Sequence, residues 1–410
     1  MELLSPAGSM EKLFYAYTYG ADAAYIGLKN FSLRLKADNF NNDEYNEIKK
    51  IKNNKKLYAA INIYFHDSDI KQLEKEIEYI SLYPIDAFII SDLGILPTLK
   101  KYFPGKEFHL STQANCVNSE SAKFYRDIGF SRIIPGRELS LKEIETIKHN
   151  VENLEIEVFI HGAMCLAYSG RCFLSKYLAD RSANKGDCSH SCRWQYRVLE
   201  ESERAGEYFP IIEGDNFTSI LSSKDICMID HLQDLKNAGV DSLKIEGRMK
   251  SVYYTAVVTR AYRKALDSLE GKKTENLESY KDELLKVSHR EFSTGFFYGK
   301  DEIEKPTFTS YEREYSFLGT IVENLTPDNC YNESNNIKET FLYKLDVKNQ
   351  IRDSDVIEYI GPDIIYLEDS NFILLDENMK RIEKTDHGKI AYLQTDKILN
   401  SGYIIRKKAE

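Results

Sequence analysis

Cysteines are concentrated in one part of this chain. Of the seven cysteines, Cys165, Cys172, Cys188 and Cys192 lie in one short stretch and Cys227 follows it. Thiolates bind soft metals, and four of them suit a tetrahedral zinc ion or an iron-sulfur cluster. Structural zinc usually uses close C-x-x-C pairs, whereas six residues separate Cys165 from Cys172 and fifteen separate Cys172 from Cys188. The spacing favours a cluster over zinc, and reduced buried thiols without a metal are the remaining alternative.

Other side chains that could carry chemistry surround this stretch. His161 and Glu246 are candidates for acid–base catalysis, with a hydrogen-bonded structural histidine as an equal alternative for His161. Guanidinium groups bind carboxylates and phosphates through paired hydrogen bonds, which favours an anionic substrate, although pairing with local carboxylates would explain them as well. Polar residues at a strand end predict hydrogen bonds to a ligand. The candidate substrate-binding residues are Gln113, Asn115, Arg137, Arg171, Arg193, Lys244 and Arg248.

Eight short, mostly apolar segments predict strands of a parallel sheet. A helix, a glycine and a strand follow one another around Gly20, Gly129 and Gly239, an order typical of α/β proteins. Eight such units, without a G-x-G-x-x-G turn, favour a TIM-type (βα)8 barrel over an open doubly wound sheet. The chemistry should then lie where the loops after the strands converge. The strands are expected near residues 2, 23, 57, 87, 107, 131, 157 and 242.

The length of 410 residues predicts two domains. We expect the barrel over residues 1–300, with a cysteine-rich insertion at about 163–226 between the last two strands. Short alternating runs separated by Gly, Asn and Asp predict a small all-β barrel domain over residues 310–410. Because this second domain lacks clustered His, Cys or paired carboxylates, it should position the substrate without adding a catalytic group.

Charge and hydropathy limit where the protein works. A net charge of −10 argues against a protein coated in nucleic acid, but a local basic cleft remains compatible with it. No apolar run approaches the roughly 18 residues of a membrane helix, and the N-terminus does not read as an export signal. We therefore expect a cytoplasmic protein with no membrane partner, in which reduced cysteines serve as ligands or reactive thiols.

Several segments carry a family resemblance. The segment EVFIHGAMC (157–165), followed by GRCFLS (170–175), resembles the signature of the collagenase-like peptidase family numbered thirty-two among peptidases of unknown mechanism. The resemblance covers about residues 1–300, and the C-terminal β segment is similar to the small domain of longer bacterial members. Further similar segments are SPAGSMEKL (5–13), STQANCVN (111–118), GDC (186–188), CRWQY (192–196) and SLKIEGRMKS (242–251).

The resemblance implies an activity other than proteolysis. Members of the family are implicated in oxygen-independent hydroxylation of a tRNA wobble uridine, a ribosomal RNA cytidine and the ubiquinone ring. Prephenate is implicated in the RNA reactions, and a 4Fe-4S cluster held by four cysteines occurs in the ubiquinone pair. By spacing, the cysteines of this chain that match that ligand set are Cys165, Cys172, Cys188 and Cys227, with Cys192 as an alternate.

The tRNA uridine hydroxylase branch is the most similar. The resemblance thus implies an iron-sulfur enzyme that forms 5-hydroxyuridine in tRNA, with prephenate as a co-substrate. A collagenase-like peptidase, or a noncatalytic cluster-bearing partner of another family member, is the alternative. The sequence contains neither H-E-x-x-H nor G-x-S-x-G, and this absence weighs against the peptidase.

Overall fold

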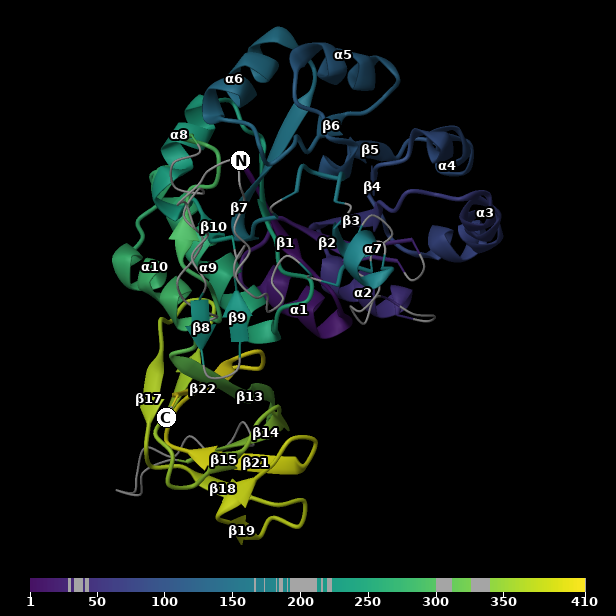
Figure 1. Ribbon diagram of the computed structural model, residues 1–410. Helices are drawn as coiled ribbons and strands as arrows, with labels where there is room; N and C mark the ends of the chain where they lie inside the picture. The colour runs from purple at the N-terminus through teal and green to yellow at the C-terminus, as the bar shows by residue number, and fades with distance from the viewer. Residues whose placement is uncertain are drawn as a thin grey trace. The chain divides into compact units, whose positions relative to one another are not determined.

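The computed structural model describes residues 1–28, 31–32, 40, 44–165, 167–172, 174–181, 183, 187–189, 191, 212–214, 217–219, 223–299, 312–325 and 340–409. The chain divides into two compact units, residues 1–275 with 289–312, and residues 276–288 with 313–410 (Figure 1). Within the described ranges, no helix is long and apolar enough to cross a membrane.

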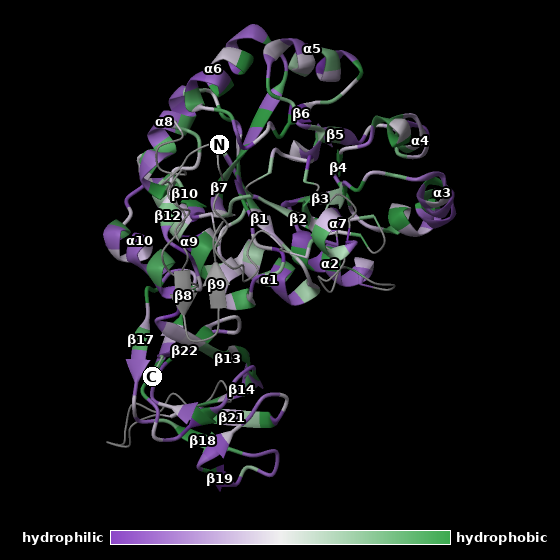
Figure 2. Ribbon diagram, in the orientation of Figure 1, coloured by the Kyte–Doolittle hydropathy of each residue, from purple (hydrophilic) through white to green (hydrophobic). Residues whose placement is uncertain are grey.

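The first unit contains a closed barrel of eight parallel strands, as the sequence predicts. Each strand from β1 to β7 pairs with the next in chain order, and β11 pairs in parallel with both β7 and β1, which closes the ring. Figure 2 shows mostly apolar or intermediate residues on these strands. The strands are β1 (Glu2–Pro6), β2 (Ala23–Gly27), β3 (Lys56–Ile61), β4 (Ala87–Ile90), β5 (Glu107–Leu110), β6 (Arg132–Ile133), β7 (Glu155–Ala163) and β11 (Ser242–Ile245).

Helices surround the barrel and begin at capping residues. Ser9 accepts a hydrogen bond from the Lys12 amide at the start of the first helix, and Ser140 forms a capping box with Glu143 at the start of α6. Helices such as α3 and α6 bury one face, whereas α9 is buried on all sides from Val252 to Tyr262. The helices are α1 (Met10–Thr18), α2 (Tyr45–Lys52), α3 (Asp67–Leu82), α4 (Leu96–Tyr102), α5 (Ser119–Asp127), α6 (Leu141–Asn150), α8 (Leu232–Asn237) and α9 (Val252–Leu269).

An insertion separates β7 from α8. Its last strand, β10 (Asp225–Cys227), returns antiparallel to the end of β7, with Asp225 opposite Ala163 and Cys227 opposite His161. The strand β12 (Phe292–Ser293) then pairs with β10. Both ends of the insertion are therefore fixed beside each other on the barrel. Its other described elements are α7 (Leu174–Ala179), β8 (Ile212–Gly214) and β9 (Phe217–Ser219).

The second unit is an antiparallel sheet of eight strands with one helix. The strand order is β17-β16-β22-β13-β14-β21-β18-β19, and β15 pairs separately with β20. The helix α10 (Leu277–Lys286) belongs to this unit, although the sequence analysis assigned residues up to 300 to the barrel. The strands are β13 (Tyr315–Asn324), β14 (Phe341–Val347), β15 (Ile351–Arg352), β16 (Ile357–Ile360), β17 (Leu367–Asp369), β18 (Ile373–Leu375), β19 (Arg381–Ile382), β20 (Lys384–Thr385), β21 (Ile390–Thr395) and β22 (Ile404–Lys408).

A buried ion pair joins α10 to the sheet. The guanidinium of Arg406 is fully buried and donates to both carboxylate oxygens of Glu283, at 2.7 and 2.9 Å. Its Nε also donates to Glu358 at 2.7 Å. Because charges this deep are tolerated only when they are paired, the contact fixes α10 against β22 and β16.

Candidate active site

The loops that follow β5, β6, β7 and β11 bring polar side chains to the C-terminal mouth of the barrel. Arg137 lies in the loop after β6, and Glu246 lies directly after β11. The Arg137 Nη2 atom is 3.4 Å from Glu246 Oε2, and Nη1 is 3.4 Å from the Ala163 carbonyl oxygen. The strand-end rule for barrels thus places Arg137 and Glu246 together, as expected from the sequence.

Arg137 is held by an aromatic ring. Its guanidinium carbon lies 3.9 Å from the centroid of the Phe159 ring, and Nη1 lies 3.8 Å from Cys165 Sγ. Its Nε is buried and has no hydrogen-bond partner among the described residues. A guanidinium over a ring with an unused donor can bind a carboxylate or phosphate oxygen.

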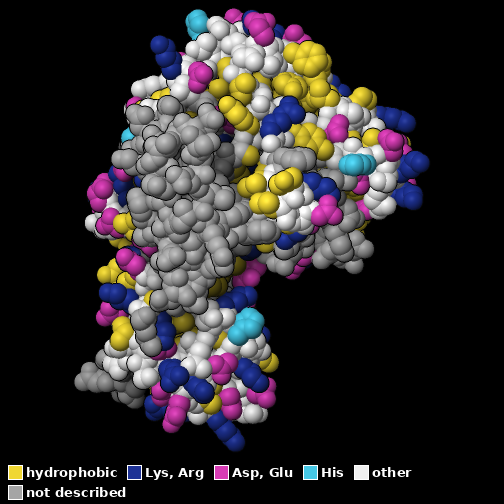
Figure 3. Space-filling view, viewed as in Figure 1, with side chains coloured by type: hydrophobic (Ala, Val, Ile, Leu, Met, Phe, Trp, Pro, Cys, Tyr) yellow, Lys and Arg dark blue, Asp and Glu magenta, His cyan; other side chains and the backbone are white. Residues whose placement is uncertain are grey.

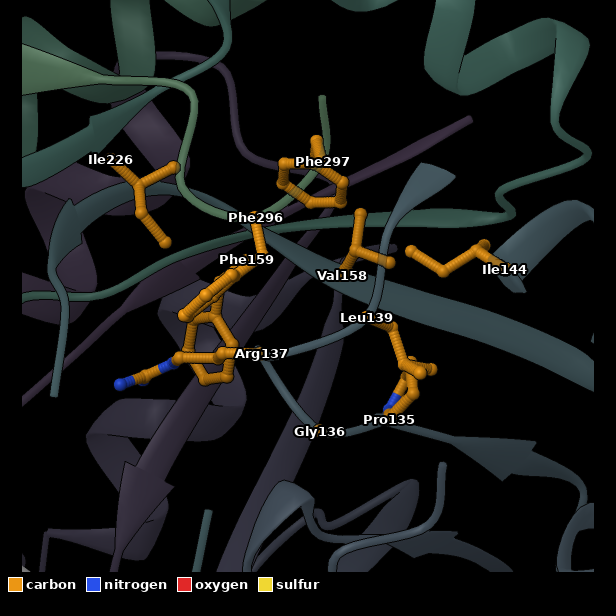
Figure 4. Close-up of a pocket in the computed structure, with 10 residues that line it drawn as sticks. All are labelled: Pro135, Gly136, Arg137, Leu139, Ile144, Val158, Phe159, Ile226, Phe296 and Phe297. Carbon is orange, nitrogen blue, oxygen red and sulfur yellow. The ribbon is translucent and has the colours of Figure 1, made fainter. Parts of the chain in front are cut away.

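An apolar pocket lies beside Arg137 (Figure 4). The lining residues border about 320 Å³ of empty space, a figure that includes open solvent, so the pocket is a shallow depression rather than an enclosed cavity. Figure 4 shows the guanidinium end of Arg137 pointing away from the side chains of Leu139, Val158 and Ile144. A pocket with apolar walls and one cation at its edge suits a small anionic or planar group. The lining residues are Pro135, Gly136, Arg137, Leu139, Ile144, Val158, Phe159, Ile226, Phe296 and Phe297.

A hydrogen-bond network around Ser169 fixes the loops after β5 and β6. The Ser169 hydroxyl donates to Glu138 Oε2 at 3.0 Å and accepts from the Arg137 amide at 3.2 Å. Thr112 Oγ1 lies 3.3 Å from the same hydroxyl. Asn115 donates its side-chain amide to Glu138 Oε1. The side chain of Asn115 thus holds Glu138 in place. Ser169 is the centre of the network, and the sequence alone did not single it out.

Gly170 presses against the loop after β5. A Cβ atom at Gly170 would lie 1.9 Å from the carbonyl oxygen of Gln113, and its φ of 72° is in the left-handed region. The same carbonyl oxygen accepts a hydrogen bond of 2.6 Å from the Tyr64 hydroxyl. Only glycine fits here, a requirement that the Ser-Gly pair in the sequence could have signalled. The side chain of Arg171, the next residue, is exposed and makes no ion pair with a described residue.

Lys244 and Arg248 are buried and bind other parts of the protein. The Lys244 ammonium donates to Glu157 Oε1 at 2.7 Å and lies 4.5 Å from the centroid of the Tyr25 ring. Burial lowers the pKa of Lys244, while Glu157 acts against this shift. Arg248 Nη1 donates to the Ser32 hydroxyl at 2.6 Å. Both cations therefore have intramolecular contacts in the structure.

His161 lies away from Arg137 and faces α9. The pairing of β7 with β11 contains a β-bulge, because Lys244 pairs with Phe159 and Ile245 pairs with His161. Such bulges change the direction in which side chains point. The His161 ring contacts the rings of Tyr254 and Tyr262, at centroid distances of 5.9 and 5.6 Å. Burial lowers the pKa of His161 to about 3. The imidazole is therefore neutral, and its Nε2 has no partner among the described residues.

The candidate cysteines differ in their exposure to solvent. Cys165 is exposed, Cys172 and Cys188 are partly buried, and burial raises the pKa of Cys227 to about 11. Cys227 lies opposite His161 in the pairing of β10 with β7. His161 is four residues before Cys165, and four residues of extended chain span about 13 Å. In the part of the chain that the structure describes, no group of three or more His, Cys, Asp or Glu side chains could hold a metal ion. The described thiols thus do not form a preassembled ligand set.

Two of the residues singled out from the sequence, Cys192 and Arg193, lie outside the described residues. Gln113 is partly buried in the 3-10 turn Thr112–Ala114 after β5, and its side chain makes no hydrogen bond with a described residue. Of the residues predicted to bind substrate, Arg137, Arg171, Gln113 and Asn115 are therefore grouped in the loops linked by Ser169 and Gly170.

The chain is similar to a known family and to several known proteins. A model described as "Peptidase family U32" matches residues 8–307. The chain is 33% identical over 414 residues to "tRNA hydroxylation protein P1" of Bacillus subtilis (strain 168), with 99% of this chain and 94% of that protein covered. It is 38% identical over 337 residues to "tRNA hydroxylation protein P" of Escherichia coli (strain K12), covering 72% and 74%. "Collagenase" of Porphyromonas gingivalis is 31% identical over 314 residues, covering 73% and 74%.

Proposed function

This chain belongs to peptidase family U32, and we propose that it is an RNA-modifying enzyme that hydroxylates tRNA. The observation that carries the proposal is the similarity to the Bacillus protein, which extends over 99% of this chain. The position of Arg137 at the barrel mouth supports it, because a guanidinium there can pair with an anionic group of the substrate or co-substrate.

In its finer form, we propose that the reaction converts the wobble uridine of tRNA to 5-hydroxyuridine without molecular oxygen. Prephenate, which the resemblance implies as the oxygen donor, carries two carboxylates. The Arg137 guanidinium, which lies over the Phe159 ring and has an unused Nε donor, is the group offered to such a carboxylate. Glu246 lies 3.4 Å from Arg137 and is the candidate to take up or supply a proton at this point.

We also propose a 4Fe-4S cluster as the cofactor, held by Cys165, Cys172, Cys188 and Cys227, with Cys192 as the alternate ligand. Such a cluster would supply redox or Lewis-acid chemistry that amino-acid side chains lack. The concentration of cysteines in the insertion supports it. Among the described residues the thiols do not form a ligand set, so these cysteines would have to come together when the cluster binds. Anaerobic purification with iron, sulfide and zinc analysis tests it, and a protein free of iron and sulfide would exclude it.

Proteolysis is the second candidate, favoured by the similarity to the Porphyromonas collagenase. A cysteine peptidase needs a thiol of lowered pKa beside a histidine. Cys227 and His161 lie opposite each other, but burial raises the pKa of the thiol to about 11 and lowers that of the imidazole to about 3. These shifts are the reverse of what such a dyad requires, so they argue against Cys227 and His161 as a peptidase dyad.

The test compares tRNA from cells with and without the gene. Nucleoside analysis should find 5-hydroxyuridine-type nucleosides only when the gene is present, while the purified protein should leave gelatin intact. Unchanged nucleosides together with gelatin cleavage would reverse the ranking of the two functions. A partner protein of the same family stays a prediction, and copurification would detect it.

A further inference from the structure

We propose that Tyr168 and Arg171 together bind one unpaired nucleotide of the substrate RNA, the tyrosine through its base and the arginine through its phosphate. This inference rests on the proposed function. It assigns the two residues a contact with RNA that neither the family match nor the names of the relatives specify.

The two residues are the ends of one tight turn. The Arg171 amide donates to the Tyr168 carbonyl oxygen at 3.0 Å, and Gly170 has a φ of 72° at the third position, as a type II turn requires. The ends of such a turn are less than about 7 Å apart. An aromatic ring and a guanidinium thus begin from neighbouring points of the backbone.

The middle of the turn is buried, whereas its ends are exposed. Ser169 is bonded to Glu138 and to the Arg137 amide, and Gly170 packs on the Gln113 carbonyl oxygen. Tyr168, by contrast, is 70% exposed. The buried middle anchors the turn within hydrogen-bonding distance of the Arg137 loop, so the exposed pair lies at the entrance to the candidate active site.

The surface around the turn is apolar. Figure 3 shows hydrophobic side chains gathered on this face around the place that α7 has in Figure 1, with Lys and Arg side chains beside them. Tyr177 of α7 is 76% exposed, and with Tyr168 it is among the most exposed large hydrophobic side chains described. Exposed aromatic rings such as these are the groups on which unpaired bases stack.

The chemistry of the pair selects single-stranded RNA as the occupant. Unpaired bases stack on aromatic rings, whereas bases within a duplex are not accessible to such a ring. Arg171 is exposed and makes no ion pair with any described residue, and a guanidinium binds phosphate oxygens through paired hydrogen bonds. That charge acts on Tyr64, whose pKa is raised by burial and is in part lowered again by Arg171.

The experiment measures binding of the full-length protein to a labelled RNA hairpin with an unpaired loop, and to a fully paired duplex of the same stem. Tyr168→Ala should weaken hairpin binding about tenfold to a hundredfold and leave duplex binding unchanged. Tyr168→Phe, which keeps the ring, should bind like the wild type. Tyr102→Ala is the matched control, because Tyr102 is 45% exposed at the end of α4, which leads into β5 at the end of the barrel away from the mouth.

Salt dependence separates the role of the arginine from that of the ring. Arg171→Gln should reduce the slope of log affinity against log salt by about 0.7, the contribution of one phosphate contact to a single strand. Arg171→Lys should restore the slope, and Tyr168→Ala should leave it as in the wild type. A local structural defect would not produce this division between the two residues.

Hairpin binding that is unchanged in Tyr168→Ala overturns the proposal, and it would be the result if the surface binds protein instead. A wild-type chain that binds no RNA overturns it as well. Because binding is measured without turnover, the outcome is distinct from that of the nucleoside analysis. Loss of binding in the variants supports the pair even if no 5-hydroxyuridine is formed, whereas normal hydroxylation with unaffected binding refutes the pair alone.

Discussion

The guanidinium carbon of Arg137 lies 3.9 Å from the centroid of the Phe159 ring, and its Nη2 lies 3.4 Å from Glu246 Oε2. A lysine would keep the charge but could neither lie along the ring nor donate in a plane. We expect Arg137→Lys to lower kcat/KM for tRNA hydroxylation by about tenfold or more, with little change in melting temperature. Arg126→Lys at the end of α5 is the control, and full activity of Arg137→Lys would contradict this role.

Lys244 should contribute mainly to stability. It pairs with Glu157 inside the barrel, and Glu157 is fully buried. Lys244→Met leaves that carboxylate with only Arg132 as a cationic partner among the described ion pairs, so the free energy of unfolding should fall by about 3 kcal/mol in urea denaturation. Lys148→Met, which breaks the partly exposed pair with Asp241, should lower it by less than about 1 kcal/mol. Equal losses in the two variants would show that the depth of the pair does not matter.

His109 should make the folded state sensitive to acid. Burial lowers the pKa of His109 below its ordinary value of 6.5. Below about pH 6.5 the unfolded chain therefore binds a proton at His109 that the folded chain does not. The free energy of unfolding is unaffected by His109 above this pH and decreases as the pH falls below it. Between about pH 7 and pH 5, the loss attributable to His109 is up to about 2 kcal/mol. His109→Gln should remove this part of the loss, whereas replacing the exposed His149 should not.

Gly170→Ala should displace the turn that carries Tyr168 and Arg171. The added methyl group would lie 1.9 Å from the Gln113 carbonyl oxygen. Gly105→Ala is a matched control, since Gly105 has a similar φ of 80° but a methyl group added there would meet no atom within 4 Å. Both variants incur the backbone strain of about 1 kcal/mol, but only Gly170→Ala should reduce RNA binding and hydroxylation, by about tenfold. A similar loss in both would point to strain alone.

Arg406→Met should loosen α10 from the sheet of the second unit. Glu283 would lose two of its hydrogen bonds while it stays buried, which costs about 3 kcal/mol. Hydrogen exchange should then accelerate in β22 and β16. Arg381→Met, at a residue whose side chain is 67% exposed, should leave exchange unchanged. If both variants exchange alike, the buried pair does not hold α10 in place.

The barrel could be predicted from sequence because its signals are local. Each strand is a short apolar run, and glycines such as Gly20, Gly129 and Gly239 mark the turns before three of them. The rule that loops converge at strand ends then sufficed to place Arg137 and Glu246 at one mouth. The antiparallel β unit was likewise visible in its alternating segments.

The contacts of individual side chains could not be predicted in the same way. Lys244 is paired with Glu157, 87 positions away, and Arg248 with Ser32, 216 positions away. The extra residue in β7 that turns His161 toward α9 follows from the register of two strands, which no local pattern encodes. Ser169 was overlooked because a serine in a loop becomes distinctive only when its partners in other loops are known.

The antiparallel pairing of β10 with the end of β7 gives the insertion a closed base. Its two ends leave the barrel from adjacent points, so changes in the length of the inserted chain alter only a loop whose closure entropy grows slowly with length. The barrel does not need the insertion to close, because β7 and β11 pair with each other directly. We therefore expect that the insertion can be exchanged between relatives at Ala163 and Asp225, and that the barrel of such a chimaera still folds.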